Sequence, residues 1–278
     1  MQTFLSMTKL PKIRFFLALA ILITASLVHA DIKDLFHFRD ILDDMAPGVF
    51  FVFDNDNTLT RPKQTLGSNQ WYVWQLQQFQ SQGMTAQQAF EKTEALWVKI
   101  ENKTEVKLTE PDVAQTIKII QTKNATMLET ARSTDLHKAT VEQLRSVGIN
   151  FLVNPPSRSE VTVKSNPGSL YTDGIFHMGN GGDKGKDLVG FLKETGLQFT
   201  KIIFADDQME NVQAVSDALT KAGIAHTAYH YRREDLIVKE FKPETAEIQM
   251  RVFEKTGALI PDRIAECSNK VDALLVTQ

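Results

Sequence analysis

Residues 49–60 read VFFVFDNDNTLT, and this stretch constrains the fold more than any other part of the chain. Its first five residues are an unbroken run of Val and Phe, which is typical of a strand buried on both faces of a parallel sheet. Asp54 and Asp56 follow at once, with Thr58 two residues further on. Ligands of open α/β sheets bind just beyond the carboxyl ends of the strands, so this position favours a chemical role for the two acids. A plain Asp-Asn-Asp turn is the alternative interpretation.

Strand and helix patterns alternate through the rest of the chain. Further apolar runs predict strands at 125–128, 149–153, 201–205 and 224–229. The segments between them predict helices at 133–148, 184–195 and 209–222, with Ser133 as an N-cap and Gly196 and Gly223 as terminators. This alternation predicts an α/β fold, a doubly wound Rossmann-like parallel sheet. The Asp173-Gly174 pair predicts a hairpin turn.

Two segments interrupt the alternation and are predicted insertions. Residues 69–122 read as Gln-rich helices that Gly83 and Pro111 divide. The predicted boundaries are a core of residues 31–62 and 123–278, a helical cap insertion at 63–122, and a smaller insertion at 156–182. The aromatic residues of the cap either form its own core or line a pocket for an apolar leaving group; they are Trp71, Tyr72, Trp74 and Phe79.

The first 30 residues have the layout of a secretory signal peptide. Three cations precede an uncharged run at 15–28, and Val28-His29-Ala30 resembles a small-residue cleavage site, so we expect removal after Ala30. An uncleaved anchor helix is the alternative, but about 14 uncharged residues are too few to span a bilayer. We therefore expect a periplasmic or secreted protein with no membrane span after cleavage.

Charge and composition narrow the function classes further. Loss of the three cations of the signal peptide takes the formal charge from −3 to −6, which gives no electrostatic basis for binding nucleic acid. The single cysteine, Cys267, excludes an intrachain disulfide. The glycine-rich stretch at 179–187 fails the P-loop pattern, because Asn180 and Asp187 stand where that pattern has Gly and Ser or Thr. The histidines at 177, 226 and 230 show no metal-ligand spacing and receive no role.

Four elements stand in a fixed order along the chain. Asp54-Asn55-Asp56-Asn57-Thr58 comes first, Thr130 follows the second strand, Lys184 begins a helix, and Asp206-Asp207 follow a later strand. Together they resemble the four motifs of the haloacid-dehalogenase-like (HAD) hydrolases. Within that superfamily the motifs resemble those of a group of exported bacterial proteins of unassigned function, which have Asn-Asp-Asn-Thr-Leu after the first Asp, a Thr-x-Arg second motif and a Gly-Ile-x-x…Lys-Gly stretch. In this chain the last two correspond to Thr130-Ala131-Arg132 and to Gly174-Ile175-Phe176 before Lys184-Gly185.

The resemblance implies phosphoryl transfer, which needs an in-line nucleophile and positive charge around the phosphate. Asp54 would be the nucleophile and form an aspartyl-phosphate, and Asp56 would be the general acid and base. A carboxylate at the position of Asp56 implies phosphatase or phosphomutase chemistry, because dehalogenases and ion-pumping ATPases of the superfamily lack it. The expected activity is hydrolysis of a phosphomonoester, with a small phosphorylated molecule as the substrate.

The resemblance also implies a Mg²⁺ site and contacts to the phosphate. Its ligands would be the Asp54 carboxylate, the Asp56 backbone carbonyl and Asp206, with Asp207 beside them; oxygen ligands suit this cation. An N-cap role for Asp206-Asp207 is the alternative. Lys184 would pair with Asp54 and the phosphate, and Thr130 would donate its hydroxyl to a phosphate oxygen. Asn55 and Arg132 would bind the substrate.

One residue departs from the family pattern, and two other functions fit the same motifs. Glu129 stands before Thr130 where an apolar residue is usual; it is either a buried acid that needs a partner or a sign that the strand ends one residue early.

The residues of the four motifs would also serve a phosphotransferase or phosphomutase. A secreted interaction protein that keeps the fold without useful turnover would bind a partner through the cap helices.

Overall fold

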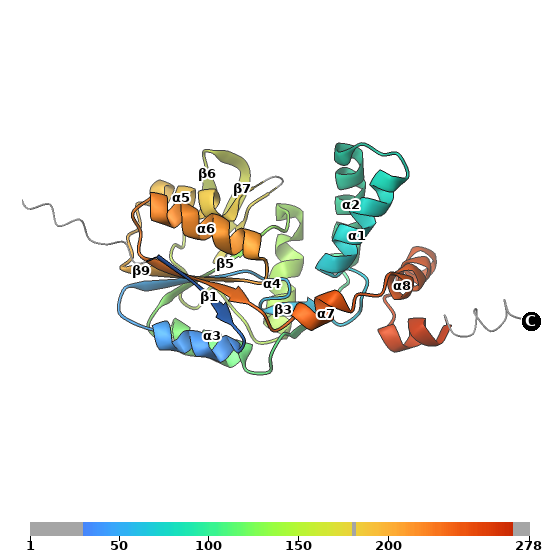
Figure 1. Ribbon diagram of the computed structural model, residues 1–278, viewed down its shortest axis with the longest axis horizontal. Coiled ribbons are helices and arrows are strands. Elements are labelled where there is room, and N and C mark those ends of the chain that lie inside the picture. Colours follow the sequence, from blue (N-terminus) through green and yellow to red (C-terminus); the bar gives the residue numbers. More distant parts are fainter. Residues whose placement is uncertain (1–29, 180–181, 269–278) are drawn as a thin grey trace, which may run out of the picture.

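The computed structural model describes residues 30–179 and 182–268, so the predicted signal peptide lies outside the described residues except for Ala30. A mostly parallel sheet forms the centre of this part of the chain (Figure 1). Its eight strands, in spatial order, are β1 (Ala30–Leu35), β10 (His226–Tyr231), β9 (Lys201–Asp206), β2 (Val49–Phe53), β5 (Ala125–Thr130), β8 (Ile175–His177), β7 (Asn166–Thr172) and β6 (Val161–Val163). The neighbours from β1 to β8 are parallel, and β7 and β6 are antiparallel additions.

Helices cover both faces of the sheet, which confirms the predicted doubly wound α/β fold (Figure 1). On one face lie η1 (Phe38–Asp44), α3 (Val113–Gln121) and α4 (His137–Ser146), and on the other lie α5 (Lys184–Thr195) and α6 (Met209–Lys221). Strand β2 contributes side chains to the apolar clusters on both faces of the sheet, because successive side chains of a strand point to opposite faces. Phe51 and Phe53 pack on the α3 side, and Phe50 and Val52 pack on the α5 side. The unbroken apolar run therefore marks a central strand.

The predicted strand at 149–153 is wrong. These residues form an irregular segment after α4, and β8 takes the place beside β5 instead, with Leu128 opposite Ile175. Ile149 and Phe151 are buried in the same apolar cluster as Phe53. The error has a physical cause: a short apolar run reads the same in a buried strand and in a loop whose side chains fill the core.

The predicted hairpin at Asp173-Gly174 is confirmed, and it is what brings β8 into the sheet. Asp173 has φ 54° and Gly174 has φ 78°, the left-handed pair that a tight two-residue hairpin turn requires. β7 pairs with β8 across this turn, and Thr172 lies opposite Ile175. The backbone also passes Phe151 closely here, since a Cβ on Gly174 would lie 2.5 Å from the Phe151 carbonyl oxygen.

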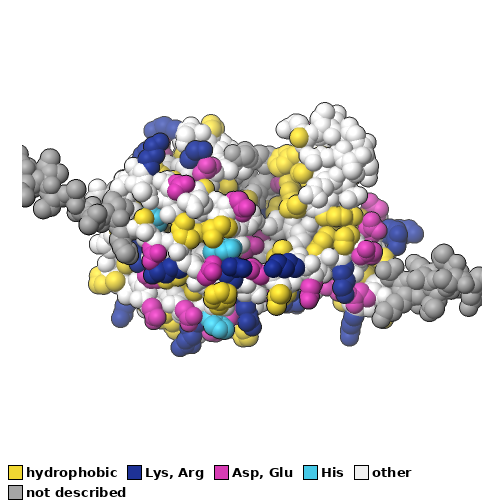
Figure 2. Space-filling view, viewed as in Figure 1, with side chains coloured by type: hydrophobic (Ala, Val, Ile, Leu, Met, Phe, Trp, Pro, Cys, Tyr) yellow, Lys and Arg dark blue, Asp and Glu magenta, His cyan; other side chains and the backbone are white. Residues whose placement is uncertain are grey.

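The helical cap, defined here as α1 (Asn69–Ser81) and α2 (Ala86–Glu101), projects to one side of the sheet (Figure 1). Both helices begin at a capping hydroxyl: Ser68 accepts from the backbone N–H of Trp71, and Thr85 forms a capping box with Gln88. A small antiparallel ribbon of β3 (Thr60–Pro62) and β4 (Val106–Leu108) joins the cap to the core. Hydrophobic side chains gather on the side of the cap that faces the core (Figure 2).

The cap has its own apolar cluster, and the C-terminal part of the chain completes it. Leu66, Trp71, Trp97 and Ile100 pack with Ala246 of α8 (Pro243–Thr256), which follows the short helix α7 (Asp235–Lys239). Trp71 is therefore a core residue, whereas Trp74 is only half-buried. Helix α3 belongs by sequence to the predicted insertion 63–122 but packs on the sheet with the core helices.

Candidate active site

The predicted acids meet at the carboxyl ends of neighbouring parallel strands. Asp54 follows β2 and Asp206 ends β9, and these two strands are hydrogen-bonded neighbours. The chain adds β5 on one side of β2 and then β9 and β10 on the other, so the strand order reverses between β2 and β9. Such a switch point is where open α/β sheets bind their ligands.

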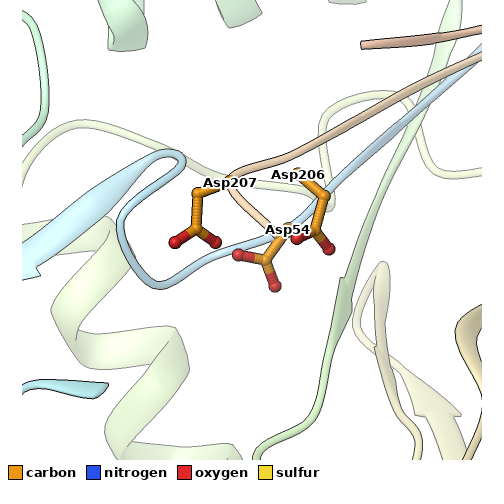
Figure 3. A group of neighbouring side chains, drawn as sticks. All are labelled: Asp54, Asp206 and Asp207. Carbon is orange, nitrogen blue, oxygen red and sulfur yellow. The ribbon is translucent and has the colours of Figure 1, made fainter. Parts of the chain in front are cut away.

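Three carboxyl groups form a compact cluster at this point. Asp54, Asp206 and Asp207 each offer an oxygen atom, and these atoms all lie within 4.8 Å of one another (Figure 3). Asp54 and Asp206 are buried, and the Oδ1 atom of Asp207 is buried without a hydrogen-bond partner in the described part of the chain. Burial raises the pKa of Asp54 to about 7, and burial together with the charges of Asp206 and Asp54 raises the pKa of Asp207 well above its usual range. A cation among them would relieve both effects.

Lys184 supplies one positive charge to the cluster. Its Nζ atom donates to Asp54 Oδ1 at 2.5 Å and to Asp206 Oδ2 at 2.6 Å, and its side chain is 1% exposed. Burial lowers the pKa of this ammonium, but the charges of Asp206 and Asp54 outweigh it and raise the pKa above its ordinary value. Lys184 reaches the cluster as the first residue of α5, which Asp183 caps. One ammonium does not neutralise three carboxylates, so the oxygen-only set fits a hard divalent cation.

Asp56 lies outside that cluster, in a partly buried pair with Arg132. The guanidinium donates from Nε to Asp56 Oδ2 at 2.8 Å and from Nη2 to Asp56 Oδ1 at 2.7 Å, a bidentate geometry that fixes the direction of the carboxylate. Nη2 also donates to Glu101 Oε2 at 3.0 Å, and Nη1 donates to Gln143 Oε1 at 2.6 Å. Glu101 ends helix α2, so Arg132 links the cap to Asp56.

These contacts engage the side chain of Arg132 within the protein, and its predicted contact with the substrate stays a prediction. Its side chain is 1% exposed, and its donors face Asp56, Glu101 and Gln143. Burial alone would lower the pKa of Arg132, but the two carboxylates raise it above its ordinary value. The guanidinium is therefore charged and fully engaged within the protein, and its arrangement indicates a positioning role.

Asn55 holds the loop after β2 in shape, and its predicted contact with the substrate stays a prediction. It is 1% exposed, its side-chain oxygen accepts from the Thr60 hydroxyl at 3.1 Å, and its backbone carbonyl accepts from the N–H groups of Thr58, Leu59 and Thr60. These bonds fold residues 54–60 into a tight loop after β2. Asn57 adopts φ 62° in that loop and donates from Nδ2 to Asp207 Oδ2 at 3.2 Å. Asn55 shapes the loop, and Asn57 is the residue that reaches the acid cluster.

Thr130 and Glu129 lie at the end of β5, which continues through Thr130, so the strand does not end early. The Thr130 hydroxyl accepts from the backbone N–H of Arg132 at 3.2 Å. Glu129 is fully buried, and neither carboxyl oxygen has a hydrogen-bond partner within the described residues. Burial raises its pKa well above the ordinary value, although the charge of Lys184 opposes that rise, so Glu129 is a buried acid. The predicted phosphate contact of Thr130 stays a prediction.

Several residues of this site have no signal in the sequence. Asn211 lies in the first turns of α6 and donates to both carboxyl oxygens of Asp206 at 3.1 Å. Glu101 reaches Arg132 from α2, 31 residues earlier in the chain, and Gln143 reaches it from α4, 11 residues later. Burial raises the pKa of Glu101 to about 7, and the charge of Arg132 opposes that rise. Of the site residues to which the sequence analysis gave no role, Asn57 is the one that lies inside a predicted motif.

Curated relatives of this chain come from Chlamydia. A protein of Chlamydia pneumoniae is 28% identical over 83% of this chain and 87% of its own length, and one of Chlamydia trachomatis is 24% identical over 76% and 78%. Both carry the provisional name outer membrane protein. Among the described residues of this chain, we find no helix with the length and apolar character needed to cross a membrane.

Two solved structures show a weak similarity to this fold. One is a haloacid dehalogenase-like hydrolase of Streptococcus pneumoniae, with a TM-score of 0.39 and 12% identity over 70% of this chain and 99% of that one. The other is the class C acid phosphatase of Bacillus anthracis, with a TM-score of 0.32 and 14% identity over 73% and 76%. At this level of similarity neither structure decides an activity for this chain.

A family model matches residues 34–265, which is most of the chain. The matched residues include the acid cluster, the cap and nearly the whole sheet. The chain therefore belongs to the protein family of unknown function DUF2608.

Proposed function

We propose that this protein is an exported, Mg²⁺-dependent phosphatase that hydrolyses a phosphomonoester through an aspartyl-phosphate on Asp54. The observation that carries the proposal is the buried Asp54 carboxylate, paired with Lys184 at 2.5 Å and placed within one cluster with Asp206 and Asp207. Asp56 stands two residues away with its direction fixed by Arg132. A nucleophile, an acid and base, and an oxygen-ligand cluster thus share one sheet edge.

Mg²⁺ would be held by Asp54, the backbone carbonyl of Asp56 and Asp206, with Asp207 beside them. Two observations fit a divalent cation. The buried Oδ1 atom of Asp207 has no hydrogen-bond partner among the described residues, and the three carboxyl groups of the cluster outnumber the single ammonium of Lys184. When bound, this ion would neutralise charge on the phosphate and orient it toward the nucleophile.

The chain's own groups would carry the bond changes. An oxygen of Asp54 attacks phosphorus, the bond from phosphorus to the ester oxygen breaks, and Asp56 gives its proton to the leaving oxygen. Asp56 then takes a proton from water, whose oxygen attacks the phosphorus of the aspartyl-phosphate and releases Asp54 and inorganic phosphate. The charge of Lys184 opposes the rise in the pKa of Asp54 and adds positive charge beside the phosphate, and the Thr130 hydroxyl would donate to a phosphate oxygen.

The location proposed for this activity is the periplasm or the exterior of the cell. The layout of residues 1–30 supports export, and the names of the chlamydial relatives agree with a location beyond the cytoplasm.

Two proposals compete with hydrolysis. One is phosphotransferase or phosphomutase activity on the same residues, and the other is an interaction protein without turnover.

The test is phosphate release by purified residues 31–278 from an aryl phosphate, with Mg²⁺ and with a chelator. We expect turnover that needs Mg²⁺, that Asp54→Asn abolishes, and that Asp206→Asn lowers at least about 100-fold. Asp217→Asn, an exposed acid on α6, is the matched control and should keep full activity. A folded protein that binds Mg²⁺ and turns over no phosphomonoester would favour the interaction protein, and transfer to an added alcohol in preference to water would favour the phosphotransferase.

A further inference from the structure

A cleft of about 690 Å³ opens between the cap and the core, and it meets the acid cluster at Asp207 and Asn57. One wall is the face of α1 that carries Val73 and Trp74, and the opposite wall is formed by α7 and the start of α6. Gln70 of α1 lies at 3.5 Å from Asn57, between side-chain nitrogen and oxygen, so the cap touches the loop of the catalytic aspartates. A substrate with its phosphate at Asp54 would extend its leaving group into this cleft.

The cleft collects apolar side chains that the fold leaves in contact with water. Val73, Met209 and Val238 are 49%, 41% and 37% exposed, and all three line it. Trp74 and Phe241 line it as well, with ring centroids 6.3 Å apart. Apolar groups gathered at a concave surface are stabilised when a ligand removes them from water, which marks this surface as a binding site.

The charges around the cleft argue against a second anionic group on the ligand. Four carboxyl groups line it against two cations, Arg232 and Lys239; the acids are Asp207, Glu210, Glu234 and Asp235. Arg232 is already paired with Asp235 at 2.6 Å. Glu234 is also paired, with Arg61 at 3.1 Å, so among the described residues Lys239 is the one lining cation without an ion pair, and the exposed Glu210 offsets its charge. The cleft therefore offers little to hold a carboxylate or second phosphate, and a neutral leaving group fits it better.

Helix α1 adds neutral hydrogen-bonding groups on both sides of its apolar wall. Asn69, Val73 and Gln77 recur every four residues, with Gln70 and Trp74 beside them, so all five share one face of the helix. The face therefore offers amides at its ends and an aromatic ring at its middle. That order suits a flat apolar ring whose edges carry polar atoms.

We infer that the cleft binds the leaving group of the substrate, and that this group is a neutral aromatic ring system stacked against Trp74. The inference rests on the proposed phosphatase activity and narrows its substrate class to phosphomonoesters of aromatic alcohols without a second anionic group. Val73 and Phe241 complete the apolar contact, and the amides of α1 contact the ring edge.

The test compares esters whose leaving alcohols have similar acidity. Differences in kcat/KM then report binding in the cleft and not the intrinsic reactivity of the ester. We expect kcat/KM for 2-(1-naphthyl)ethyl phosphate to exceed that for propyl phosphate by roughly 10- to 100-fold. Benzyl phosphate should likewise exceed 4-carboxybenzyl phosphate. Val73→Asp should reduce the naphthyl preference at least about 10-fold, whereas Val153→Asp, at a 58% exposed valine outside the cleft, should leave it unchanged. Trp74→Ala tests the ring, with thermal melting as the check of folding.

Binding of 2-(1-naphthyl)ethylphosphonate, measured by calorimetry, separates failure of the inference from failure of the proposed function. Turnover without an aromatic preference overturns the inference and leaves the phosphatase standing. Phosphonate binding that Val73→Asp weakens and Val153→Asp does not, without turnover of any ester, overturns the phosphatase and supports the cleft as a site for neutral aromatic ligands. Neither turnover nor binding overturns both.

Discussion

Arg132 is the side chain that fixes the direction of Asp56, the proposed acid and base. A lysine would keep the positive charge, but its single ammonium cannot replace the guanidinium, which donates to Asp56, Glu101 and Gln143 at the same time. We expect Arg132→Lys to lower kcat roughly 10- to 100-fold with little change in KM, because the guanidinium donates to Asp56, Glu101 and Gln143. The free energy of unfolding should fall by about 1–3 kcal/mol as well. Steady-state kinetics and urea unfolding measure the two effects.

Arg145→Lys is the matched control, because Arg145 is exposed on α4, the helix that also carries Gln143. It should change neither quantity. A rise in KM for Arg132→Lys with kcat unchanged would contradict the positioning role and support the substrate contact that the sequence suggests.

Glu129 is a second residue whose surroundings predict a measurable effect, this time on stability. Its pKa in the folded protein is raised, so its contribution to stability is fully present below about pH 4.5, the usual range of an unfolded glutamate, and is lost as the pH rises. Glu129→Gln removes that loss. We expect the variant to match the wild type near pH 4.5 and to be more stable by about 1 kcal/mol or more at pH 8, measured by urea unfolding with chelator present.

Glu254→Gln is its control, since Glu254 is exposed on α8 and should give the same difference at both pH values. A gain for Glu129→Gln that is equal at pH 4.5 and pH 8 would refute a raised pKa of the buried Glu129.

The contact between α5 and α6 sets where Lys184 lies. Gly185 follows that lysine in α5, and a Cβ on it would lie 2.2 Å from the backbone carbonyl oxygen of Ala214 on α6. We expect Gly185→Ala to push the helices apart, to destabilise the protein by roughly 2 kcal/mol or more, and to lower phosphatase activity by moving Lys184. Gly196→Ala, at φ 67° with open space around it, should cost only about 1 kcal/mol and keep full activity. Equal losses in the two variants would contradict this view of the helix contact.

Across the whole molecule, the C-terminal segment ties the cap to the core. Gln249 of α8 is fully buried, accepts from the Leu66 N–H at 2.8 Å and donates to Asp262 at 2.8 Å, and Asp262 accepts from the Thr65 N–H at 2.7 Å. We expect Gln249→Leu to leave these groups unpaired and to speed hydrogen exchange in α1 and α2 roughly 10-fold or more, while β2 and β9 stay protected. Gln213→Leu, at an exposed position on α6, should alter neither region. Uniform loss of protection would mean that the cap and the core unfold together.

Much of this architecture could be predicted because it depends on local patterns. The apolar run before Asp54 predicted the central strand β2, and Asp173-Gly174 predicted the hairpin into β8, since only a few residue types tolerate two successive left-handed conformations. Strand ends also carry their own information: acids that follow parallel strands must meet at one edge. The resemblance to the HAD motifs adds Lys184 to Asp54 and Asp206, and its ammonium lies within hydrogen-bond distance of both acids.

The sequence by itself thus determined the central strand β2, the alternation of strands and helices that gives an α/β fold, and the chemical groups at the end of the sheet. Tertiary structure alone decided the partners of those groups. It placed β8 rather than residues 149–153 beside β5, turned Arg132 toward Asp56 and Glu101, and brought α8 under the cap. The physical reason is that periodicity and turn chemistry act over a few residues, whereas burial and charge pairing join positions such as Asp56 and Arg132 that the chain keeps far apart.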